Sequence, residues 1–170
     1  MAQISTEVPG DERGTLLAFV EAQRVALRES VRGLTEEQAA SRPSASELSL
    51  SGLLKHVAEV ELVWLRLAQQ RPNERQRSME RWSEGFRLAE GESIEDVLAF
   101  WDGVVREAEA FVAAVPSLDD TFPLPPAPWF PKDGKVSVRW MLLHLVEEFA
   151  RHAGHADVVR ESIDGTKAMG

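Results

Sequence analysis

The sequence MLLHLVEEFARHAGHADVV, which runs from Met141 to Val159, decides the fold. Its apolar residues recur every three or four positions, which is the spacing of an α-helix that buries one face. That face includes Met141, Leu145, Phe149, Ala156 and Val159. A carboxylate and two imidazoles lie in the same stretch, although burying such groups without partners costs free energy. We therefore predict a packed helix whose polar residues are candidates for a functional site.

The same spacing predicts three more long helices, and therefore an all-α four-helix bundle. The four helices are expected at residues 12–33, at 49–70 or 51–70, at 93–115 and at 137–163. Capping boxes at Thr35–Gln38 and Ser93–Asp96 predict a short additional helix and the start of the third long one. The sequence has no alternating strand pattern and no internal repeat. Residues 1–170 are thus predicted to form a single helical domain.

Two connections are longer than the roughly 2 to 8 residues that usually join helices in a bundle. One covers residues 71–92 and contains Trp82 and Phe86. The other covers residues 116–136 and contains six prolines together with Trp129 and Phe130. Each segment is interpreted either as a lid with aromatic contacts or as a long crossover that its aromatic residues attach to the bundle.

The composition narrows the class of protein. The chain has 170 residues, 44% of them hydrophobic and 28% charged, which is usual for a globular domain. A formal net charge of -9 argues against nucleic-acid partners and against an anionic membrane surface. The N-terminal residues lack a signal-peptide pattern and no apolar run is long enough to span a membrane, so we expect a cytoplasmic protein. The sequence contains no cysteine, so any thiol chemistry requires a thiol substrate.

Helical geometry places three polar residues on buried faces. At about 100° per residue, Glu148 and His152 lie roughly 40° and 80° from His144, on or beside an apolar stripe that spans about 60° to 140°. His56, on the second long helix, has apolar neighbours on either side. Two neutral imidazoles and one carboxylate suit zinc, with iron, nickel and manganese as competitors. We therefore predict that His56, Glu148 and His152 bind one divalent metal ion.

Other interpretations of these polar residues stay open at this stage. A histidine such as His56 on an apolar face is often a hydrogen-bonded core residue. Glu148 can instead form a structural ion pair with Arg24 or Arg28 of the first helix. Glu61 projects toward the apolar side of the second long helix, where an ion pair with an arginine is the simplest explanation.

Two further histidines lie toward the edge of the apolar stripe. His155, one turn after His152, is a candidate catalytic residue that could shuttle a proton or hydrogen-bond a metal ligand. Alternatively, His155 is a residue at the rim of the site that takes no part in the chemistry. His144 is predicted to lie at the surface or at the outer side of the site.

Three segments carry a resemblance to a known family. They are LSGLLKHVAEVELVWL, FRLAEGESIEDVLAFWD and VRWMLLHLVEEFARHAGHADVVRESIDG. Together they resemble the DinB-like four-helix bundle metalloproteins, in the branch related to mycothiol-dependent maleylpyruvate isomerase and to mycothiol or bacillithiol S-transferases. The resemblance implies an up-down-down-up bundle in which His56, Glu148 and His152 bind a divalent metal. The isomerase carries an additional C-terminal domain that this sequence lacks, so its particular substrate is not expected to transfer.

These observations predict a metal-dependent enzyme that acts on a thiol. The expected reaction joins a low-molecular-weight, mycothiol-like thiol to an electrophile, with zinc as the first choice of metal and nickel, iron or manganese as alternatives. One alternative is a non-catalytic, stress-associated dimer in which the metal is structural, and a homodimer is also an option for the enzyme. Another is a hydrolase in which the metal activates water.

Overall fold

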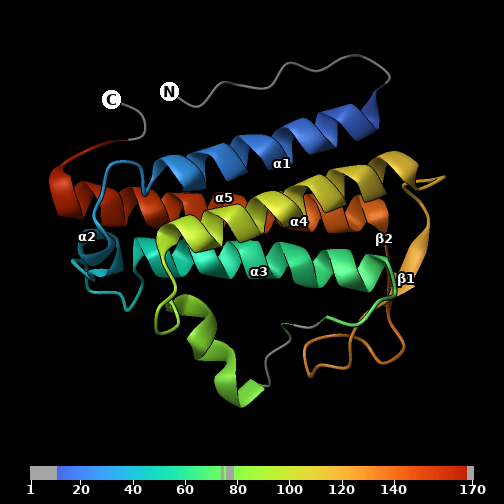
Figure 1. Cartoon of the computed structure of the whole chain (residues 1–170). Helices are drawn as coiled ribbons and strands as arrows, with labels where there is room; N and C mark the ends of the chain where they lie inside the picture. The colour runs from blue at the N-terminus through green and yellow to red at the C-terminus, as the bar shows by residue number, and fades with distance from the viewer. Residues whose placement is uncertain (1–10, 74, 76–78, 168–170) are drawn as a thin grey trace.

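The computed structural model describes residues 11–73, 75 and 79–167 (Figure 1). The N-terminal residues in which no signal peptide is predicted lie largely outside this part, and so does the side chain of Trp82. Within the described residues, no helix combines the length and the apolar character needed to cross a bilayer.

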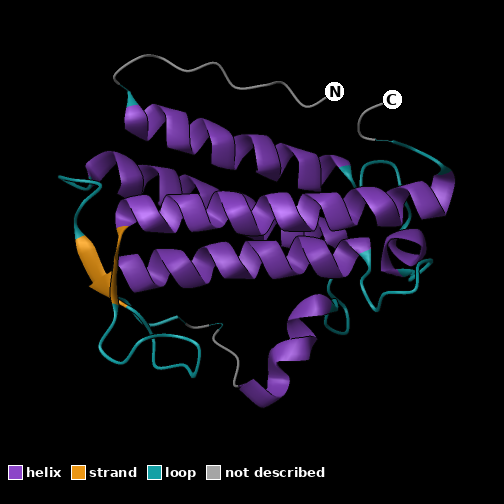
Figure 2. Cartoon of the chain, turned by 180° about the vertical axis from the view of Figure 1, so that it is seen from behind, coloured by secondary structure: helices purple, strands orange, loops and turns teal. Residues whose placement is uncertain are grey.

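Four long helices lie side by side and form the body of the molecule (Figures 1 and 2). They are α1 (Glu12–Glu29), α3 (Leu50–Ala68), α4 (Ile94–Ala114) and α5 (Val138–Asp164). The predicted all-α bundle is confirmed, and most boundaries lie within two residues of expectation. Helix α1 ends earlier than residue 33, in a turn where the Ser30 hydroxyl donates to the Leu27 carbonyl and Gly33 adopts a positive φ of 74°. Glycine adopts this conformation without steric cost.

The order of the helices is up-down-down-up. Figure 1 shows that α1 and α5 run in one direction along the bundle, whereas α3 and α4 run in the opposite direction. Helix α3 contacts both α4 and α5, and α1 packs mainly on α5. Because α3 and α4 are parallel, the chain must return along the length of the bundle between them. This return explains the long connection after α3.

Both predicted capping boxes are present. The Thr35 side chain accepts from the Gln38 N–H, and the Gln38 side chain accepts from the Thr35 N–H, at the start of α2 (Glu36–Ala40). Ser93 and Asp96 make the same reciprocal pair at the start of α4. Each box satisfies backbone donors that have no partner within the helix.

Both long connections contain short regular elements that the sequence pattern did not predict. The first includes the 3₁₀ helix η1 (Met79–Phe86), which packs on α3. The second includes an antiparallel pair, β1 (Thr121–Pro123) and β2 (Lys135–Ser137), with Phe122 opposite Val136. Figure 2 shows this pair at one end of the bundle. Strands of three residues are too short to produce a recognisable alternation.

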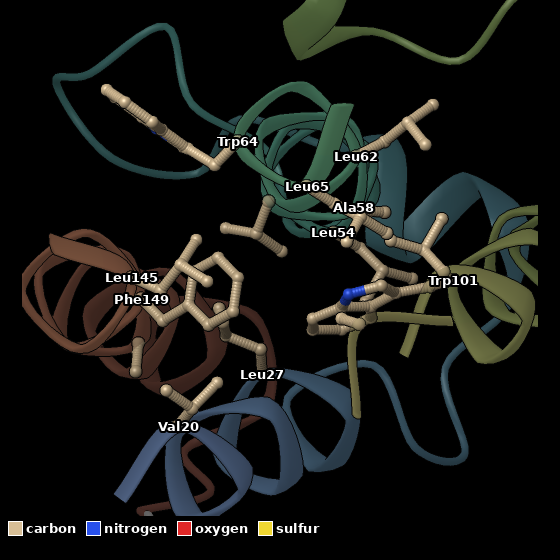
Figure 3. Close-up of a cluster of buried hydrophobic side chains, with 14 of the residues drawn as sticks. Val20, Leu27, Leu54, Ala58, Leu62, Trp64, Leu65, Trp101, Leu145 and Phe149 are labelled. Carbon is tan, nitrogen blue, oxygen red and sulfur yellow. The ribbon is translucent and has the colours of Figure 1, made fainter. Parts of the chain in front are cut away.

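The core lies between the four long helices (Figure 3). Val20 and Leu27 of α1, Leu54 of α3, Trp101 of α4 and Phe149 of α5 are at most 1% exposed. The rings of Trp101 and Phe149 meet edge to face, with centroids 5.9 Å apart. Burial of these side chains from all four helices holds the bundle together.

One ion pair is enclosed in this core. The Arg24 guanidinium, 1% exposed, pairs with the Glu61 carboxylate, 0% exposed. The Trp101 indole N–H donates to the same carboxylate at 2.7 Å. The ion pair predicted for Glu61 is therefore present.

Candidate metal centre

The site lies between two antiparallel helices. His56 is on α3, after the N-cap Ser49 and among the buried residues Leu53 and Val57. Glu148 and His152 are one turn apart on α5, so both side chains point from the same face of that helix. Because α3 and α5 are in contact, this face of α5 meets His56. The packing of the two helices therefore brings together residues separated by more than half of the chain.

One carboxylate oxygen joins the two imidazoles. Glu148 Oε1 lies 3.1 Å from His56 Nε2 and 3.2 Å from His152 Nε2. One donor atom from each of the three residues lies within 4.8 Å of the others. The structure thus brings together the three predicted ligands at a single point.

The three side chains are shielded from solvent to different extents. His56 is 5% and His152 8% exposed, and the Glu148 side chain is 17% exposed. Hydrogen bonds from His152 and His56 hold the pKa of Glu148 well below its ordinary value, although partial burial acts in the opposite direction. The carboxylate is therefore ionised at neutral pH, the form in which a carboxylate binds a metal.

The geometry fits a small divalent cation. A tetrahedral zinc ion with bonds of about 2.0–2.1 Å holds its ligand atoms roughly 3.3 Å apart. The two oxygen-to-nitrogen distances in the structure, 3.1 and 3.2 Å, are close to that separation. Nitrogen and oxygen donors of this kind suit zinc and also iron, nickel or manganese. All three donor atoms lie within 4.8 Å of one another, so these residues can hold an ion once the side chains adjust around it.

The structural ion pair considered for Glu148 is not formed. Arg24 pairs with Glu61 in the core. Arg28 lies 2.6 Å from Asp102 and its guanidinium stacks over the Trp101 ring at 4.6 Å. Both arginines are thus engaged by other groups, and the partners of Glu148 are histidines.

The other two histidines occupy different surroundings. His155 is exposed, and its Nδ1 lies 3.4 Å from Nδ1 of His152. His144 packs between two tryptophans, edge-on to Trp64 with centroids 4.8 Å apart and stacked on Trp140 at 5.0 Å. His155 therefore contacts a predicted ligand, whereas His144 belongs to an aromatic cluster.

Phe86 of η1 covers one side of the site. Its ring stacks on the His56 imidazole, with centroids 4.0 Å apart and planes inclined by 18°. The sequence indicated an aromatic residue in a long connection, but helical spacing does not reach into a crossover. This contact therefore could not be derived from the pattern.

Glu148 is expected to make the metal-free protein sensitive to acid. Its carboxyl has an ordinary pKa of 4.5 and a lowered pKa in the folded state. The corresponding stability is complete above about pH 4.5 and is lost as pH falls toward the folded-state pKa, because the unfolded chain takes up the proton first. Urea titrations from about pH 5 to about pH 3 should show wild type losing up to about 1.4 kcal/mol per pH unit more than Glu148→Gln. Parallel pH curves for the two proteins would contradict this expectation.

Comparisons with known proteins agree with the fold and identify a family. The family model described as mycothiol-S-transferase matches residues 15–165. A solved structure, described as the crystal structure of the conserved protein of locus from Enterococcus faecalis, is similar to this chain with a TM-score of 0.70 at 13% identity. That similarity covers 91% of this chain and 98% of the other, and at this identity it supports the fold alone. No curated protein matches the sequence.

Proposed function

The chain belongs to the mycothiol-S-transferase family, and from this premise we propose that it is a metal-dependent thiol S-transferase. The observation that carries the proposal is the meeting of one ionised carboxylate and two imidazoles at a point where helices α3 and α5 face each other. Facing helices of a bundle are a common place for such a centre. The reaction would join a small, mycothiol-like thiol to an electrophile.

In this proposal His56, Glu148 and His152 hold a divalent ion, with zinc as the first choice. Three protein donors leave one position of a tetrahedral site for a substrate atom. When bound, the ion would supply positive charge that favours the thiolate form of an incoming thiol. The sulfur then forms a bond to an electrophilic carbon while the bond from that carbon to its leaving group, such as chloride, breaks. The thiol proton and the leaving group both pass to solvent.

His155 is proposed as the group that moves this proton. Its imidazole is exposed, so it can exchange protons with solvent. Its Nδ1 also lies 3.4 Å from Nδ1 of His152, which leaves Nε2 of His152 directed at the shared carboxylate oxygen. Such contacts orient the ring of a ligating histidine.

The structural-metal alternative has less support. A structural zinc site is closed by a fourth protein ligand, for which His155 and His144 were the candidates. His144 is held between Trp64 and Trp140, and His155 approaches the Nδ1 side of His152, away from its Glu148 contact. A homodimer stays a prediction, whether the metal is catalytic or structural.

A small thiol and an electrophile are the expected partners, with no role for nucleic acid or a membrane surface. The net charge of -9 supports the exclusion of polyanionic partners. We place the protein in the cytoplasm, where low-molecular-weight thiols are kept reduced.

Metal analysis and a thiol-conjugation assay test the proposal together. Protein purified without a metal-affinity tag is expected to contain about one divalent ion per chain. It should conjugate mycothiol to chlorodinitrobenzene, lose that activity on chelation and regain it when zinc is returned. Bacillithiol and cysteine in parallel reactions report the choice of thiol. Absence of metal, or conjugation that chelation leaves intact, would overturn the proposal.

A further inference from the structure

In the described part of the crossover between α3 and α4, the ring of Phe86 reaches the proposed metal centre. Phe86 is half-buried and stacks on His56 at 4.0 Å, and its centroid lies 6.2 Å from that of His152. The close, nearly parallel stack on His56 leaves little room for that imidazole to rotate out of its plane. In its present orientation, His56 directs Nε2 at Glu148 Oε1.

A glycine allows Phe86 to approach this closely. Gly52 lies one turn before His56 on the same face of α3. A Cβ at position 52 would lie 2.1 Å from the Phe86 carbonyl oxygen. Phe86 therefore rests on α3 at two places, with its carbonyl on Gly52 and its ring on His56. Any side chain at position 52 would have to move the crossover outward.

An ion pair secures the segment that follows Phe86. Lys55, next to His56 on α3, is 4% exposed and pairs with Glu92. Glu92 also accepts from the Ala89 N–H at 2.8 Å. The crossover is thus attached to the same turn of α3 that carries His56.

Phe86 also borders an open cleft of about 290 Å³. The cleft is lined by Glu47, Leu48, Ser83, Phe86 and Arg87. Phe86 therefore belongs both to the wall of this cleft and to the surroundings of His56. Removing its ring would expose the imidazole to water from the cleft side.

We propose that Phe86 is a positioning residue for His56: its ring, held in place by Gly52, fixes the imidazole for metal binding and excludes water from that side. The inference rests on the proposed metal centre. Residues that orient ligating histidines without touching the metal affect affinity because they reduce the reorganisation needed on binding.

Zinc affinity and zinc release into excess chelator test this role without an activity assay. Phe86→Leu keeps an apolar side chain but loses the ring, and we expect about a tenfold loss of zinc affinity with faster release. Phe86→Tyr retains the ring and should restore wild-type affinity. Cobalt-loaded protein should report the same change through its visible absorption spectrum, which follows ligand geometry.

Matched controls separate positioning from general packing. Phe130→Leu removes a half-buried ring from the other long connection, where it packs 6.3 Å from Trp64, and should leave zinc affinity unchanged. Gly52→Ala should reproduce the effect of Phe86→Leu. Gly103→Ala is its control, because a Cβ there meets nothing within 4 Å.

The outcomes distinguish this inference from the proposed function. Zinc affinity of Phe86→Leu within about twofold of wild type would overturn the positioning role and leave the metal centre intact. Wild type that binds neither zinc nor iron, nickel or manganese would overturn both. If Gly52→Ala fails to fold, as a thermal unfolding scan would show, the comparison of Phe86→Leu with Phe86→Tyr decides the question.

Discussion

Glu148→Gln is expected to remove the metal and to lower thiol transfer by more than about a hundredfold, beyond the range seen for residues that only support a ligand. Glu148 Oε1 contacts both imidazoles, at 3.1 and 3.2 Å, so the two histidines share this anionic partner. Glutamine has nearly the same size, but its neutral amide oxygen is a much weaker ligand. The fold should therefore persist while the centre is lost.

Metal content and turnover of purified proteins measure this effect. The matched control is Glu147→Gln, because Glu147 is adjacent, its side chain is 62% exposed, and it pairs with Arg151. The control should keep both metal and activity, whereas His56→Ala should behave like Glu148→Gln. His155→Gln should bind metal almost normally and show a reduced kcat, since the proposal gives it only the proton. Full metal content in Glu148→Gln would refute the predicted ligand set.

The largest loss of stability is expected from Glu61→Gln, which should cost about 3–5 kcal/mol of unfolding free energy. This change leaves the Arg24 guanidinium, 1% exposed, without its fully buried counter-charge. The remaining acidic partners of Arg24, Glu21 and Glu109, lie at the rim, and the side chain of each is 49% exposed. Water screens them, so they compensate the buried charge only weakly.

The control variant removes a different acidic partner of Arg24. Glu109→Gln removes a rim partner 3.3 Å from Arg24 and should cost at most about 1 kcal/mol. Urea unfolding followed by circular dichroism compares the two variants, because the fluorescence of Trp101 is itself affected by its bond to Glu61. A loss below about 1 kcal/mol for Glu61→Gln would show that the buried pair adds no more than the rim pair.

Much of the fold follows from local features that a sequence displays directly. Helical spacing indicated all four long helices, and the boxes at Thr35 and Ser93 identified two helix starts. The end of α1 was misjudged because the turn at Ser30 continues the apolar spacing for a few more residues. The strands β1 and β2 escaped prediction because three residues show no period.

For the candidate metal site as well, some features follow from the sequence and others only from the tertiary structure. The sequence by itself determined which residues face inward, since Glu148 and His152 are fixed on one side of α5 by the helical repeat and His56 on a buried face of α3. The sequence could not determine which charged groups pair. Arg24 was a possible partner of Glu148, and only the packing of the helices shows that Arg24 pairs with Glu61. Phe86, which stacks on His56, lies in a crossover that has no sequence repeat. The role of Gly52 depends on the Phe86 backbone that packs against it. Periodicity determines which way side chains point within one helix. Contacts between segments depend on how the helices and connections pack, and only the tertiary structure decided that packing.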